Sequence, residues 1–63
     1  MYEIKAMRVI GDTAITNTIK TATSLSGPLG ALALAKAAWR EAAEDVVVVF
    51  AIEPKTGWII WRS

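Results

Sequence analysis

The chain has 63 residues with no cysteine and no histidine, and seven basic residues against six acidic ones give a net charge of +1. This composition excludes disulfides and the thiolate or imidazole ligands of a zinc site, and it lacks the clustered basic charge of a duplex-DNA binder. We expect one small domain without metal or cofactor, whose core is small enough for self-association to help stabilise it.

The sequence also argues against a membrane protein. A membrane-spanning helix needs roughly 20 apolar residues, and Lys36 interrupts the longest apolar helical run at Leu29–Ala35. Glu3 stands where a secretion signal would carry basic charge. We therefore expect a cytoplasmic location.

Residues 2–10 and 13–21 predict a β-hairpin. The first segment alternates in polarity, the second is rich in threonine and isoleucine, and Gly11-Asp12 between them is typical of a two-residue turn. The predicted pairs are Ile10 with Thr13, Arg8 with Ile15, Ala6 with Asn17, Ile4 with Ile19, and Glu3 with Lys20.

Residues 29–45 predict the helix, since they contain strong helix formers and no β-branched residue. Ser24 or Ser26 would cap it, and Pro28 suits its first turn. The predicted core-facing stripe comprises Leu32, Ala35, Trp39, Ala42, Ala43 and Val46. Ala31, Leu34 and Ala38 would then offer a second surface, for another helix.

Residues 46–52 and 58–63 predict a second hairpin, closed by the turn 53–57 with Gly57 in a left-handed conformation. The expected pairs are Glu53 with Trp58, Ile52 with Ile59, Ala51 with Ile60, Phe50 with Trp61, and Val49 with Arg62. The fold prediction is an α+β domain of ββαββ order: a four-stranded antiparallel sheet with one helix on one face. The strand order stays open.

One helix covers only one face of a sheet. The residues expected on the covered face are Tyr2, Ile4, Ile10, Ile15, Ile19, Val48, Phe50, Ile52, Ile59 and Trp61. Those expected on the other face are Met7, Val9, Val47, Val49, Ala51, Trp58 and Ile60. Seven apolar side chains left in water favour association, so we expect this second set to form the interface of a homo-oligomer, a dimer or larger.

The segment 23–35 raises the question of a phosphate site. Ser24, Ser26, Gly27 and Gly30 could present hydroxyl and backbone donors at a helix N-terminus. The P-loop pattern is absent, however, and ordinary helix capping explains the same residues and is the favoured interpretation.

Aromatic residues offer further candidates. Trp39 and Trp61 are expected in the core, facing each other across helix and sheet. Trp58 is expected at the oligomer contact or as a stacking platform. In the ligand hypothesis Tyr2 also stacks on a base, and Arg62 lies near the phosphate.

Three functional hypotheses follow, none of them enzymatic, because the usual general base and the best nucleophile are both missing. The first is an oligomeric binding module that holds or sequesters a phosphorylated or nucleotide-like molecule, as a phage accessory protein would. The second is a protein-interaction module or inhibitor that uses an apolar sheet face or a strand edge. The third is a weak binder of single-stranded nucleic acid.

Overall fold

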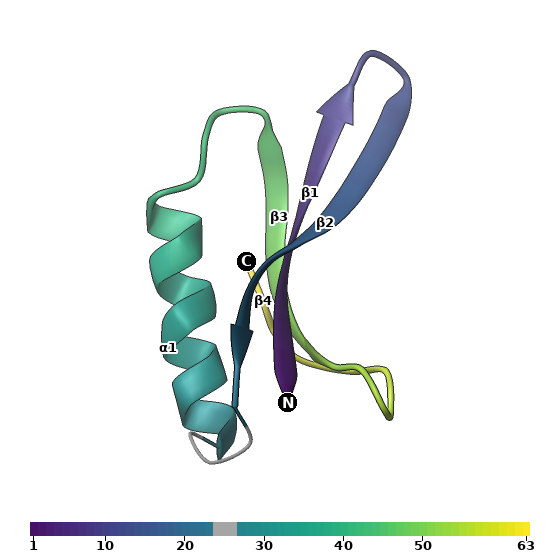
Figure 1. Ribbon diagram of the computed structural model, residues 1–63. Helices are drawn as coiled ribbons and strands as arrows, with labels where there is room; N and C mark the ends of the chain where they lie inside the picture. The colour runs from purple at the N-terminus through teal and green to yellow at the C-terminus, as the bar shows by residue number, and fades with distance from the viewer. Residues whose placement is uncertain (24–26) are drawn as a thin grey trace.

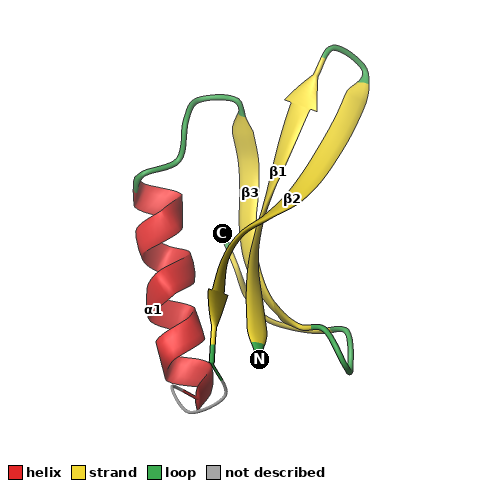
Figure 2. Cartoon of the chain, viewed as in Figure 1, coloured by secondary structure: helices red, strands yellow, loops and turns green. Residues whose placement is uncertain are grey.

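Four strands and one helix make up the described part of the chain (Figures 1 and 2). The structure, a computed structural model, describes residues 1–23 and 27–63. The elements are β1 (Tyr2–Ile10), β2 (Thr13–Ala22), α1 (Gly27–Arg40), β3 (Val46–Glu53) and β4 (Trp58–Arg62). Neighbouring strands are antiparallel, in the order β2-β1-β3-β4. The predicted ββαββ architecture is confirmed.

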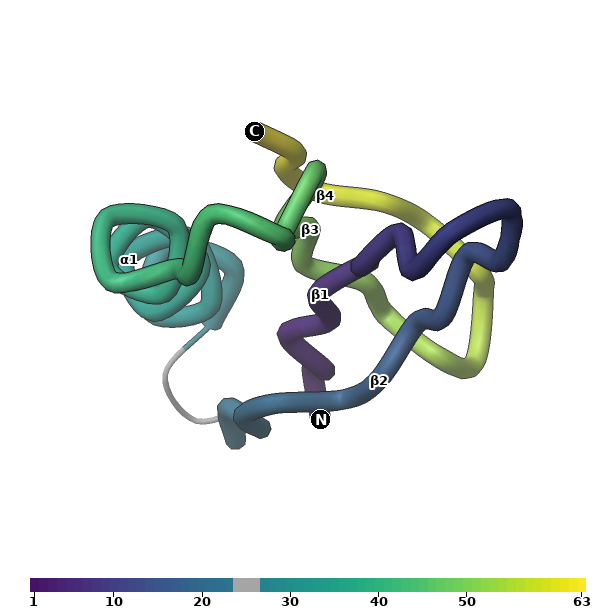
Figure 3. Tube along the Cα trace, turned by 90° about the horizontal axis from the view of Figure 1, so that it is seen from above, coloured from purple at the N-terminus to yellow at the C-terminus, as the bar shows by residue number. Residues whose placement is uncertain are grey.

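The strand order explains where the helix lies. Because β2 and β3 are both antiparallel to β1, they run parallel to each other, and parallel strands need a long connection of this kind. Seen from above, α1 occupies one layer and the strands the other (Figure 3). The helix therefore covers one face of the sheet, which we call the helix side; the opposite face is the open face.

The first hairpin closes as predicted. Gly11 has a φ of 60°, and no non-glycine residue among those described has a positive φ, which fits a turn with glycine at its first central position. The predicted pairs from Ile10–Thr13 to Ala6–Asn17 are present. A bulge at Ile19 then shifts the register, so the predicted Ile4–Ile19 and Glu3–Lys20 pairs are wrong, and Ile4 faces Lys20 while Glu3 faces Thr21.

The second hairpin has the predicted turn and a similar shift. Gly57 has a φ of 76°, and its N–H donates to the Glu53 carbonyl at 2.8 Å. The pairs Glu53–Trp58 and Ile52–Ile59 are confirmed. A bulge at Ile60 then makes the other three predicted pairs wrong: Ala51 faces Trp61, Phe50 faces Arg62, and Val49 bonds with Ser63 instead of Arg62.

The helix approaches the sheet through alanines. Ala31 and Ala35 are fully buried and Ala38 nearly so, a spacing of four and three residues that puts them on one face. The predicted stripe is therefore rotated, and Ala31 and Ala38 do not form a second, outward surface. Trp39 is 41% exposed, so its predicted core position is wrong; an indole on the inner face would hold the helix away from the sheet. Trp61 does pack against the core.

The faces of β3 are the reverse of those predicted. Ile4 and Ala6 are buried on β1, and their partners on β3 are Ala51 and Val49. Residues directly opposite one another share a face, so Val49 and Ala51 point to the helix side and are fully buried. Their predicted place on the uncovered face is wrong. The alternate residues Val48, Phe50 and Ile52 lie on the open face and are half-buried.

Several isoleucines predicted on the covered face are exposed because the helix is too short to reach them. Fourteen helical residues span about 21 Å, whereas the nine residues of β1 span about 30 Å. The tip of the first hairpin accordingly projects past α1 (Figure 1). The isoleucines left exposed toward this tip are Ile10 and Ile15. Ile19 is exposed at the bulge. Ile59 is on the open face, opposite Ile52, so its predicted place on the covered face is wrong.

Candidate functional site

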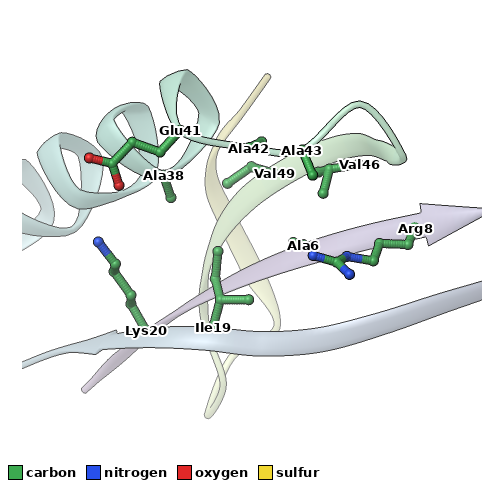
Figure 4. Close-up of a pocket in the computed structure, with 10 residues that line it drawn as sticks. All are labelled: Ala6, Arg8, Ile19, Lys20, Ala38, Glu41, Ala42, Ala43, Val46 and Val49. Atoms are coloured by element: carbon green, nitrogen blue, oxygen red, sulfur yellow. The ribbon is translucent and has the colours of Figure 1, made fainter.

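A pocket opens between the C-terminal end of α1 and strands β1, β2 and β3. Its volume is about 270 Å³. Figure 4 shows its walls, which comprise Ala6, Arg8, Ile19, Lys20, Ala38, Glu41, Ala42, Ala43, Val46 and Val49. Alanines supply four of these residues, and their short side chains leave the space that larger ones would fill.

The charges around this pocket are balanced. Arg8 forms an ion pair with Asp45 at 3.6 Å, and both side chains are close to half exposed. Lys20 and Glu41 extend toward one another from β2 and from the end of the helix (Figure 4). Two cations and two carboxylates therefore surround an apolar floor, which suits a small, partly apolar molecule better than a highly charged anion.

The two predicted phosphate residues that the structure describes, Gly27 and Gly30, do not line this pocket. Ser24 and Ser26 lie outside the described residues. Gly27 begins α1 with a φ of 65°, and Gly30 is in its first turn, whereas the helical residues that line the pocket begin at Ala38. The positive end of a helix dipole is the N-terminal end, whereas this pocket is at the C-terminal end of α1.

The residues predicted to hold a base are also scattered. Tyr2 packs against the core, and Trp58 is 73% exposed at the start of β4. Arg62 is on the open face opposite Phe50. None of the three lines the pocket.

The open face carries a short apolar row with charged neighbours. Phe50 lies between Lys5 on β1 and Arg62 on β4. Lys5 pairs with Glu3 at 3.4 Å, and Glu3 also accepts a hydrogen bond from the Thr18 hydroxyl at 3.5 Å. Polar side chains therefore share the open face with Phe50, so the face is a mixed surface instead of the continuous apolar patch that the sequence predicts.

The predicted interface set divides accordingly. Val49 and Ala51 belong to the core, and Ile60 packs against it. Met7 is half-buried opposite Val48 on the open face. The three exposed members, at 45–73% exposure, are Val9, Val47 and Trp58.

The edge strand β2 is a surface that sequence analysis did not single out. Nine of its ten residues are exposed, and only Ala22 at its end is buried. On its outer side β2 pairs with no other described strand. The edge strand β4, by comparison, has five residues. The signal was present as the threonine and isoleucine content of residues 13–21, but its meaning depends on β2 being at the edge.

In the two described ranges, no helix is long and apolar enough to cross a membrane. Those ranges also contain no group of three or more acidic side chains placed to hold a metal ion. No protein-family model matches the chain, and comparisons with curated proteins and with solved structures give no match.

Proposed function

We propose that the chain is a non-enzymatic interaction module that accepts an extended strand of a protein partner along the outer edge of β2. The observation that carries this proposal is the exposure of nine consecutive residues, 13–21, on an edge strand. An edge strand presents a row of unpaired backbone N–H and C=O groups, and an added strand satisfies them.

The backbone geometry identifies which residues would make those bonds. Ile10 and Thr13 flank a two-residue turn, so they form a hydrogen-bonded pair, and alternate residues of β2 then bond inward to β1. Ala14, Thr16 and Thr18 are the residues between, and their N–H and C=O groups point to the open edge. A partner strand would form its ladder on these three.

The edge carries few of the features that protect natural edge strands. Charged side chains, prolines and bulges commonly block strand addition. In β2 the one charge is Lys20 and the bulge is at Ile19, and both are near its end. Residues 13–18 contain neither, and their uncharged side chains suit a partner strand of hydroxyl and aliphatic residues.

Proline at position 16 tests the proposal. We expect Thr16→Pro to remove one outward N–H while the inward ladder to β1 persists, because proline is tolerated where the missing N–H faces solvent. Thr16→Val is the matched control, since it keeps the N–H and the side-chain shape. The probe is a ten-residue peptide of alternating threonine and isoleucine, titrated against labelled chain and followed by amide chemical shifts.

The expected result is peptide-dependent shifts at Ala14, at position 16 and at Thr18 in the parent and in Thr16→Val, and no such shifts at Ala14 and Thr18 in Thr16→Pro. The unliganded spectra of all three must show the same fold. Equal binding by the proline and valine variants would contradict the proposal, as would shifts confined to the pocket.

A second candidate function is favoured by the pocket itself: capture of a small, partly apolar molecule, for which mononucleotides are the probes because the sequence predicts a nucleotide-like ligand. Its support is the apolar floor, with Arg8, Lys20 and Glu41 at the rim. Ala43 is exposed and lines the pocket, so Ala43→Phe would fill it, whereas Ala33→Phe, at an exposed position earlier in the helix, would not. Calorimetric titration with four mononucleotides should give heat in the parent and in Ala33→Phe only; silence in all three removes this candidate.

A further inference from the structure

The sequence of β2 is nearly symmetric about Asn17. Reading outward from this residue, threonine lies on both sides, then isoleucine on both sides, and threonine again four residues away in each direction. The one mismatch is Ala14 against Lys20. We infer that the strand added at this edge is β2 of a second copy, antiparallel, with a two-fold axis through Asn17. This inference rests on the proposed function and names its partner.

A two-fold axis at this residue makes the pairing self-complementary. In such an interface each contact occurs twice with the roles of the copies exchanged. Thr16 lies opposite Thr18 of the second copy, and both residues have backbone groups that point to the edge, so each such pair can bond directly. The backbone groups of Asn17 bond inward to β1. Asn17 therefore lies opposite Asn17 of the second copy in a pair that shares no backbone hydrogen bonds.

The side chains also match across this axis. Ile15 is opposite Arg8, and Ile19 and Arg8 both line the pocket, so the two isoleucines lie on the helix side. Their exposed fractions are 39% and 46%. In the dimer, Ile15 of each copy lies beside the bulge residue Ile19 of the other on the same face, which covers four aliphatic side chains that are partly exposed in the protomer.

The open face adds a second matched set. Thr16 and Thr18 face Met7 and Lys5 across the ladder, so both threonines are on the open face. The axis puts Thr16 of each copy opposite Thr18 of the other. Threonine pairs across strands are favourable. A two-fold axis perpendicular to the sheet keeps both helices on one side, and the result is a continuous sheet of eight strands.

Charge does not oppose the pairing. Lys20 is the one charged residue of β2, and it lies three residues from the axis, beyond the bulge at Ile19. The two lysines are therefore five to six residues apart along the strands, about 17–20 Å at about 3.3 Å per residue. That separation exceeds the Debye length of about 8 Å at physiological ionic strength, so their mutual repulsion is screened.

Single cysteine variants test the register, since the chain has no cysteine of its own. In Asn17→Cys the two introduced thiols face each other across the axis, with Cα atoms about 4.5 Å apart, a separation that a disulfide spans. Thr13→Cys is the matched control, because it is also exposed on the same strand but lies four residues from the axis, far from its own counterpart in the second copy. In a glutathione redox buffer we expect at least ten-fold more covalent dimer from Asn17→Cys.

Native mass spectrometry over a concentration series measures the dimer without cross-linking. The parent is expected to form a dimer whose fraction rises with concentration. Asn17→Lys places two cations opposite each other and should leave only monomer, whereas Asn17→Thr should keep the dimer. Both substitutions are at an exposed residue, so circular dichroism of each should match the parent.

The outcomes separate this inference from the proposed function. Equal cross-linking of the two cysteine variants, or a dimer that Asn17→Lys leaves intact, overturns the axis through Asn17. If the chain is monomeric at every concentration but still binds the threonine–isoleucine peptide in a manner that Thr16→Pro abolishes, the inference is wrong and the strand-addition function stands. If neither the second copy nor the peptide binds, both are wrong.

Discussion

Replacing Ile4 by alanine should show how much of the stability of this small protein depends on a single side chain. Ile4 is fully buried and, with Val49, is one of the two largest fully buried side chains among the residues that the structure describes. The substitution removes three carbon atoms, worth about 2.4 kcal/mol at about 0.8 kcal/mol each. A residual cavity raises the cost, toward the upper end of the range of about 2–5 kcal/mol seen for such changes.

The same substitution at Ile10 is an internal control. Ile10 is on the same strand but is 60% exposed, so alanine there should cost only about 1 kcal/mol, the same transfer energy scaled by the buried fraction. A chain of 63 residues has a total stability of about 3–9 kcal/mol at about 0.05–0.15 kcal/mol per residue. Ile4→Ala therefore removes between a quarter and all of it.

Urea unfolding followed by tryptophan fluorescence measures both costs. With an m-value of about 1 kcal/mol/M, typical of the smallest proteins, the midpoint should fall by 2 M or more for Ile4→Ala and by about 1 M for Ile10→Ala. Both variants should be made in the Asn17→Lys background, so that self-association does not contribute. Equal midpoints for the two variants would refute the assignment of Ile4 to the core.

Two further substitutions test the close helix packing and one turn. Ala35→Leu should destabilise the fold by about 1–3 kcal/mol, because Ala35 is fully buried and a larger side chain would overpack its site. Ala33→Leu, on the exposed side of the helix, should change the stability by no more than about 0.5 kcal/mol. Thermal unfolding compares the two variants, and equal melting temperatures would contradict the packing of α1 through its alanines. Gly57→Ala should lower the free energy of unfolding by about 1–2 kcal/mol, because a φ of 76° disfavours any L side chain. Steric contact is not the reason, since a Cβ at this position would meet no atom within 4 Å. An unchanged midpoint in urea would contradict the left-handed turn.

Local signals in the sequence predicted the elements and both turns. Gly11 and Gly57 close the hairpins, and the alanine-rich segment forms the helix. The bulges at Ile19 and Ile60 carry no such signal, because a bulge needs no glycine and an isoleucine fits either register. Each bulge shifts the pairs beyond it, so the turn-proximal pairs were predictable and the distal ones were not.

The orientation of the faces depended on long-range pairing. The run 46–52 has no alternation of polarity, so its inner face is determined by its register with β1, where Ile4 and Ala6 face the helix. On α1, the larger apolar residues were expected to face the sheet because they are more hydrophobic. The alanines face it instead, because their small side chains allow close packing. The edge of β2 was not predicted as a binding surface, because only the strand order shows that β2 lies at the edge of the sheet.

The alanine-rich core and the exposed edge of β2 both leave the protomer with little buried apolar area. A helix that packs through alanines can lie close to the sheet, but each alanine buries little apolar area, and among the described residues six of the nine that are buried are alanines. Meanwhile Ile15 and Ile19, each larger than an alanine, remain in water. Pairing two copies along β2 would bury in the dimer what the protomer leaves exposed. Because only the folded chain presents this edge, association would also stabilise folding, by an amount that grows with the logarithm of the chain concentration.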